Sequence, residues 1–210
     1  MILASLDLKV SKLSLAICVY CGSGDGHDPR YIASAEALGA AIGQAGHRLV
    51  YGGGERGLMG TVARATKTAG GYVTGIIPHF LITKEKLNSS ADKVIFVDDM
   101  HQRKMQMFDL SDAFVALPGG VGTLEELVEQ MTWAQLGRHK KPIIMADIAG
   151  FWRPMMDLLA HMRMEGFIRD GLEVQTMTAE KIEDVVPMIE AWIKRHGQSS
   201  GAANWSSKLM

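Results

Sequence analysis

The feature that most restricts the fold of this chain is a pattern that occurs three times: a strand-length apolar run, a glycine-rich loop, and then apolar residues at helical spacing. The runs cover residues 14–21, 47–51 and 113–117, and the loops cover residues 22–29, 52–60 and 118–122. Such a run is typical of a buried parallel strand. A loop that leads from its carboxyl end into a helix presents free N–H groups and the positive end of the helix dipole to an anion. The pattern therefore predicts a parallel sheet with phosphate-binding loops.

The other segments extend this alternation of strands and helices. Further strands are expected at residues 72–77, 93–97 and 142–146, with a short last strand at 171–176 and an irregular loop at 79–92. Helical patterns cover residues 31–46, 58–69, 100–111, 151–165 and 181–196, besides the one after the third loop. This order predicts an α/β fold, a single Rossmann-like doubly wound parallel sheet flanked by helices. In such sheets ligands bind beyond the carboxyl ends of the strands, where the strand order switches, and all three loops fall on that edge.

No internal repeat or linker divides the chain, so we expect one nucleotide-binding catalytic domain over residues 14–196. Residues 1–13 form an N-terminal extension without the layout of a signal peptide. Residues 197–210 are rich in Ser, Gly and Ala, and we expect a mobile C-terminal tail there.

The composition excludes several functional classes. Charged residues make up 21% of the chain and the formal net charge is −1, so no basic field indicates nucleic acid as a partner. The longest apolar stretches have the length of a strand, which excludes a membrane span. Two cysteines do not build a disulfide framework, so a reducing cytoplasm is expected.

The histidines and cysteines do not indicate a metal or another cofactor. The seven histidines are scattered, without the H-x-x-x-H or H-E-x-x-H spacing of zinc sites. Cys18 and Cys21 spell C-x-x-C, but an odd spacing along a strand places their side chains on opposite faces of the sheet. A redox pair is therefore not expected.

The loop at 118–122 allows two interpretations. Gly119, Gly120 and Gly122 allow a tight turn and a close approach of the backbone to a ligand. Thr123 and Glu126 also fit a capping box, in which the two side chains satisfy N–H groups at the start of a helix. A lone T-x-x-E is usually only a cap. The two further glycine loops favour a ligand site.

The kind of nucleotide follows from what the loops lack. The segment Gly52-x-Gly54-x-x-Gly57 matches the dinucleotide fingerprint, but it follows the second strand, and no Asp or Glu ends the next strand to bind a ribose diol. No G-K-[ST] follows any strand, which excludes a triphosphate P-loop. The loops therefore favour a mononucleotide monophosphate.

Four segments resemble the motifs of the LOG ("lonely guy") family, cytokinin-activating phosphoribohydrolases once labelled lysine decarboxylases. Residues 118–126 match P-G-G-x-G-T-x-x-E, residues 52–60 resemble G-G-G-x-x-G-L-M-G, residues 100–104 resemble M-x-x-R-K, and residues 20–23 resemble the first loop of the family. The resemblance extends from about residue 14 to residue 196. One departure is Gly24, where many members have a second serine.

The resemblance implies hydrolysis of the N-glycosidic bond of nucleoside 5′-monophosphates, which gives the free base and ribose 5-phosphate. It implies that Glu126 stabilises the positive charge on the ribose and activates water, while Arg103 supplies positive charge to substrate oxygens. The implied substrate-binding residues are Gly22, Ser23, Gly53, Gly54, Met100, Lys104, Gly119, Gly120, Gly122 and Thr123.

The resemblance also implies a homodimer, and we expect Met131, Trp133 and Leu136 near its interface. Two alternatives stay open. One is a binding protein of the same fold, such as a molybdenum-cofactor carrier; the other is a nucleosidase that accepts a broader set of nucleotides. The intact R-K pair (Arg103 and Lys104) and Glu126 argue against a carrier, because a carrier needs no general base.

Overall fold

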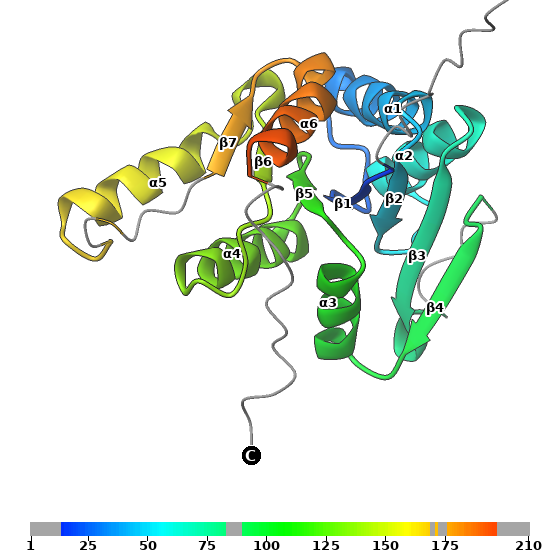
Figure 1. The fold of residues 1–210 in the computed structure, drawn as a ribbon, viewed down its shortest axis with the longest axis horizontal. Coiled ribbons are helices and arrows are strands. Elements are labelled where there is room, and N and C mark those ends of the chain that lie inside the picture. The colour runs from blue at the N-terminus through cyan, green and yellow to red at the C-terminus, as the bar shows by residue number, and fades with distance from the viewer. Residues whose placement is uncertain (1–13, 83–89, 169–170, 172–175, 197–210) are drawn as a thin grey trace, which may run out of the picture.

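The computed structural model describes residues 14–82, 90–168, 171 and 176–196, so the expectations for residues 1–13 and 197–210 lie outside it. Within these ranges the strands form one parallel sheet in the order β4-β3-β2-β1-β5-β6-β7 (Figure 1). The predicted doubly wound α/β fold is confirmed. The strands are β1 (Ala16–Tyr20), β2 (Arg48–Tyr51), β3 (Tyr72–Pro78), β4 (Lys93–Val97), β5 (Ala113–Ala116), β6 (Ile143–Ala146) and β7 (Thr176–Ala179).

Six α-helices and three single 3₁₀ turns connect these strands in the described part of the chain. The α-helices are α1 (Pro29–Gln44), α2 (Gly57–Thr68), α3 (Met100–Asp109), α4 (Val121–Gln135), α5 (Arg153–Met164) and α6 (Val185–His196). The 3₁₀ turns are η1 (His79–Leu81), η2 (Ile148–Gly150) and η3 (Ile182–Asp184). None of the described helices combines the length and the apolar composition of a membrane span.

The side chains of β1 alternate between two cores, one on each face of the sheet. Ile17 and Val19 belong to the core that α1, α2 and α6 cover. Cys18 and Tyr20 belong to the core that α3 and α4 cover, with α5 packed at its margin. Figure 1 shows the two groups of helices on opposite sides of the strands. Cys18 and Cys21 therefore lie in different cores, both buried and free, as the odd spacing predicted.

The strand order reverses between β1 and β5, at the centre of the sheet. From β1 the chain builds β2, β3 and β4 outward on one side, and then returns to add β5, β6 and β7 on the other. The loops after β2, β1 and β5 are thus neighbours at the carboxyl edge, as expected for a ligand crevice.

Two expected elements differ from the structure. The last strand is Thr176–Ala179 rather than residues 171–176, because its pairing with β6 joins Ile143 to Thr176 and Ala146 to Ala179. Residues 172–175 of the expected strand lie outside the described part. The helix expected at 181–196 is divided into η3 and α6. Pro187 lies in the first turn of α6, where its missing N–H is tolerated, so the helix begins just before it.

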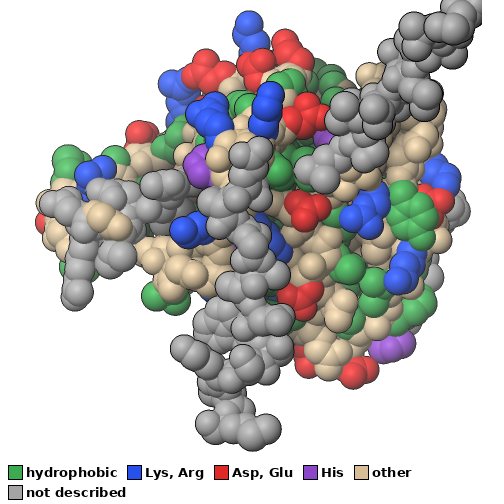
Figure 2. Space-filling model, in the orientation of Figure 1, with side chains coloured by type: hydrophobic (Ala, Val, Ile, Leu, Met, Phe, Trp, Pro, Cys, Tyr) green, Lys and Arg blue, Asp and Glu red, His purple; other side chains and the backbone are tan. Residues whose placement is uncertain are grey.

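Charged side chains of both signs share the surface. Figure 2 shows basic and acidic groups interspersed over the face in view, in keeping with the net charge of −1 for the whole chain.

Candidate functional site

The three glycine loops are joined by backbone hydrogen bonds at the point where the strand order reverses. The Gly22 N–H donates to the carbonyl oxygen of Pro118 over 3.1 Å, which ties the loop after β1 to the loop after β5. The Met59 N–H donates to the carbonyl oxygen of Gly22 over 3.3 Å, which ties in the start of α2. A Cβ on Gly119 would collide with the Thr123 side chain and the Gly22 nitrogen. Glycine is therefore required there for the loops to meet.

Helix α4 begins earlier than the capping box predicted. Its N-cap is Gly120, and no side chain caps it. Val121 is its first residue, so Thr123 lies in the first turn and Glu126 in the second. The capping interpretation of Thr123 and Glu126 is therefore wrong. Glu126 is too far along the helix to bond to the N-cap N–H, and its carboxylate is left for another role.

A hollow of about 290 Å³ opens beside this helix start, which is close to the lower end of the range for ligand pockets. Its walls come from the loops after β1 and β5, from the beginnings of α2 and α3, and from the first two turns of α4. The lining residues are Cys21, Gly22, Ser23, Met59, Met100, Arg103, Gly120, Val121, Gly122, Thr123, Glu125 and Glu126.

Arg103 is held in this hollow by the backbone of the second loop. Its side chain is buried, with the residue 7% exposed, and Nη2 donates to the carbonyl oxygen of Gly52 over 3.0 Å. Nη1 lies 3.8 Å from the sulfur of Met100, while Nε is buried without a partner. A Cβ on Gly52 would collide with the guanidinium, so glycine there makes room for it. A buried guanidinium with a free donor is suited to binding an oxygen-rich ligand.

Glu126 is the buried acid of the hollow, at 9% exposure. Burial raises the pKa of its carboxyl from 4.5 to about 7, and the charges of Glu125 and Glu129 add to this rise. The positive charges of Arg103 and Lys104 act in the opposite direction on the same pKa. A carboxyl with a pKa near neutrality can accept and return a proton under physiological conditions.

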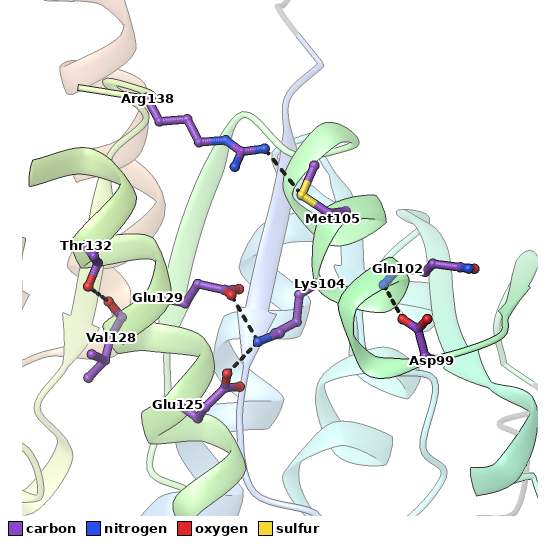
Figure 3. Close-up of polar contacts among 9 residues, drawn as sticks. All are labelled: Asp99, Gln102, Lys104, Met105, Glu125, Val128, Glu129, Thr132 and Arg138. Atoms are coloured by element: carbon purple, nitrogen blue, oxygen red, sulfur yellow. Dashed lines mark hydrogen bonds and ion pairs between the residues drawn. The ribbon is translucent and has the colours of Figure 1, made fainter. Parts of the chain in front are cut away.

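Lys104 follows Arg103 on α3, and its side chain points toward Glu125 and Glu129 on α4 (Figure 3). Its Nζ lies 2.5 Å from Oε1 of Glu125 and 3.0 Å from Oε1 of Glu129, both on α4. It is not among the residues that line the hollow. Its ammonium is therefore committed to two carboxylates of the protein.

The structure brings most of the expected site residues together. Eight of them line the hollow: Gly22, Ser23, Met100, Arg103, Gly120, Gly122, Thr123 and Glu126. Gly119 lines an adjoining hollow of about 280 Å³, which shares Gly22, Ser23 and Gly120 with the first. Gly53, Gly54 and Lys104 line neither.

Four residues of the hollow were not expected from the sequence: Cys21, Met59, Val121 and Glu125. All four lie within the recognised motifs, so their positions in the chain could have been used to predict them as site residues.

The residues expected at a dimer interface fall into three environments. Met131 is buried in the core at 3% exposure, Trp133 is partly buried, and Leu136 is 77% exposed.

The described parts of the chain contain no group of three or more His, Cys, Asp or Glu residues that could hold a metal ion.

A comparison with protein families matches residues 59–189 to a family described as "Possible lysine decarboxylase". Among curated proteins, the chain is 39% identical over 189 residues to a cytokinin riboside 5′-monophosphate phosphoribohydrolase of Arabidopsis thaliana, covering 90% of this chain and 89% of the relative. It is 40% identical over 177 residues to a protein of the same description from Rhodococcoides fascians, covering 84% and 89%.

Solved structures share the fold at lower identity. The molybdenum cofactor binding protein from Rippkaea orientalis superposes with a TM-score of 0.64 at 22% identity, covering 87% of this chain and 99% of that one. The Moco carrier protein from Chlamydomonas reinhardtii gives a TM-score of 0.65 at 18% identity, with the same coverage. These similarities support the Rossmann-like fold alone.

Proposed function

Because this chain belongs to the LOG family, whose curated members are cytokinin riboside 5′-monophosphate phosphoribohydrolases, we propose that it hydrolyses the N-glycosidic bond of such nucleotides. The products are the free base and ribose 5-phosphate. The observation that carries this proposal is that the buried side chains of Arg103 and Glu126 line the same hollow as the start of α4.

The 5′-phosphate binds at the start of α4. Gly120, Val121, Gly122 and Thr123 line the hollow at this helix terminus, where backbone N–H groups lack intrahelical partners. These N–H groups and the helix dipole favour a dianion. Ser23 adds a hydroxyl from the loop after β1. The phosphate anchored here brings the ribose toward Glu126, one turn further along the helix.

Glu126 assists the cleavage in two ways. As the bond between C1′ and the base nitrogen breaks, positive charge develops on the ribose, and a nearby carboxylate stabilises it. The same carboxylate accepts a proton from water, whose oxygen bonds to C1′. The base leaves with the electron pair of the broken bond and takes up one proton. Water is thus divided between the sugar, as OH, and the base, as H.

Arg103 provides fixed positive charge in the same hollow. Its bond to the Gly52 carbonyl sets the orientation of the guanidinium, and its free Nε can donate to a ribose or phosphate oxygen. Its charge also lowers the pKa of Glu126, which keeps part of this group ionised at neutral pH.

We further propose that the protein acts as a cytoplasmic homodimer. Helix α4 and its C-cap residue expose apolar side chains: Val121 at 83%, Leu124 at 40%, Val128 at 43% and, at the C-cap, Leu136 at 77%. Apolar residues gathered on one helix face are typical of an interface. Light scattering after size-exclusion chromatography tests this proposal, and Leu136→Glu should shift the mass toward the monomer. A wild-type protein with the mass of a monomer would contradict it.

The decisive experiment measures base release. The protein is incubated with AMP and with isopentenyladenosine 5′-monophosphate, and with the two nucleosides as controls, and the freed base is quantified by chromatography. Release from a monophosphate supports the proposal, and the ratio of the two rates reports the preferred base. Release from neither monophosphate would contradict it and favour a binding protein.

A further inference from the structure

One ammonium group serves two carboxylates next to the proposed active site. Lys104 reaches from α3 to Glu125 and Glu129 on α4, with its own side chain 13% exposed (Figure 3). Glu129 is 18% exposed, and its second oxygen is buried without a partner. The cluster therefore carries two negative charges against one positive charge. In the described part of the chain, these two ion pairs join α3 to α4.

This arrangement is unsuited to binding phosphate. The ammonium has three donors, and two of them are used by carboxylates of the protein. Lys104 does not line the hollow, whereas Glu125, one of its partners, does. A dianionic substrate would be repelled by the excess negative charge of the cluster. We therefore consider a role in which Lys104 acts on neighbouring charges of the protein and does not bind the substrate.

The position of the cluster connects it to both proposed catalytic residues. Lys104 follows Arg103 directly on α3, and the two carboxylates that it binds lie one residue before and three residues after Glu126 on α4. We propose that Lys104 is a positioning residue for the proposed reaction: by tying Glu125 and Glu129 to α3, it holds Glu126 in place and offsets the negative charge beside it. This inference rests on the proposed function.

The charges around Glu126 support this role. Burial is the main reason for its raised pKa, the charges of Glu125 and Glu129 raise it further, and Arg103 and Lys104 lower it. The buried Cys18 and Tyr20 of β1, and Cys21 just after it, also lie in its field, and burial raises their own pKa values, so they stay neutral. Removing the Lys104 ammonium would leave both flanking carboxylates uncompensated. The proton affinity of Glu126 would then rise.

The test compares Lys104→Met with the wild type across pH. We expect the acidic limb of kcat/KM to move up by about one pH unit, in the range of a lost neighbouring charge. At pH 6 the variant should then be about tenfold slower, since activity below the pKa falls tenfold per unit. Above pH 8.5 its rate should approach that of the wild type, with KM little changed. A ¹³C titration of the Glu126 carboxyl in the ligand-free protein should show the same shift.

Three further variants separate this role from others. Lys67→Met is a matched control, because Lys67 pairs with Asp92 at the opposite edge of the sheet, and we expect no shift. Lys104→Arg retains the charge and should retain the wild-type pH profile. The triple variant Lys104→Met, Glu125→Gln and Glu129→Gln removes all three charges of the cluster. Its acidic limb of kcat/KM should return to the pH of the wild type or lie below it, because the two charges that raise the pKa of Glu126 are also gone.

Two results would overturn the inference. One is an unchanged Glu126 titration in Lys104→Met. The other is a loss of activity at every pH with a raised KM that the triple variant does not relieve, which would make Lys104 a substrate ligand. A wild-type protein that releases no base would contradict the proposed function instead, and the carboxyl titration would still test Lys104.

Discussion

Glu126→Gln should abolish turnover and at the same time stabilise the folded protein at alkaline pH. Glutamine retains the size of the side chain but removes its negative charge. In the wild type that charge is buried at 9% exposure, which is unfavourable for folding but useful when the ribose becomes cationic. The two effects therefore have opposite signs.

The effect on stability can be estimated from the pKa. A rise from 4.5 in the unfolded chain to about 7 in the folded protein corresponds to roughly 3 kcal/mol, at about 1.4 kcal/mol per unit. The neutral carboxyl contributes this stability fully below pH 4.5, and the contribution is lost as the pH rises through about 7. Because glutamine does not ionise, the Glu126→Gln variant does not lose this stability as the pH rises. At pH 8.5 it should melt higher than the wild type by as much as about 6–12 °C, and at pH 4.5 by far less.

The effect on activity follows from the loss of a general base, which typically contributes about 10²–10⁴-fold. Base release from AMP should therefore fall at least about a hundredfold, while AMP binding measured by calorimetry changes little. Glu36→Gln is a matched control, because Glu36 is exposed on α1, away from the hollow. We expect wild-type activity and stability from it.

Two outcomes would refute this reasoning. Activity above about a tenth of the wild type would mean that less than about 1.4 kcal/mol of the barrier depends on the carboxylate. A melting temperature that falls at both pH values would mean that the Glu126 carboxylate stabilises the fold instead of opposing it.

Three further predictions concern the same site. Arg103→Met should lower kcat about a hundredfold or more, and Arg103→Lys should not restore it, because a lysine cannot both donate to Gly52 and present a planar fork; steady-state kinetics test this. Gly52→Ala should displace the guanidinium and lower kcat at least about tenfold with a native circular dichroism spectrum. The monophosphate should exceed its nucleoside in kcat/KM by about tenfold or more per phosphate hydrogen bond, and equal turnover would contradict the phosphate site.

Local patterns predicted most of the fold. The strand expected at residues 93–97 is β4 (Lys93–Val97), and the helix expected at 58–69 is α2 (Gly57–Thr68). The periodicity of apolar residues and the punctuation by glycine and proline are properties of neighbouring residues, so they can be read without the tertiary structure. The identity of Arg103 and Glu126 as site residues came from a motif, and the structure places both in one hollow.

The sequence-based predictions were wrong where contacts between distant segments determine the local structure. The last strand takes its position from its pairing with β6, more than thirty residues earlier in the chain. The start of α4 depends on the loop before it, which is held by the hydrogen bond between Gly22 and Pro118, beyond the ends of the neighbouring strands β1 and β5. A capping box was a reasonable local interpretation of Thr123 and Glu126, but the earlier N-cap at Gly120 moved Glu126 into the hollow.

By itself, the sequence determined the alternation of strands and helices, the three glycine loops and the residues available for chemistry, because spacing and backbone freedom are local. Only the tertiary structure decided how those residues behave. The pKa of Glu126 depends on the exclusion of water by the surrounding elements, and the partners of Lys104 lie 21 and 25 residues away on another helix. Burial and pairing of charges depend on distance in space, which no local pattern contains.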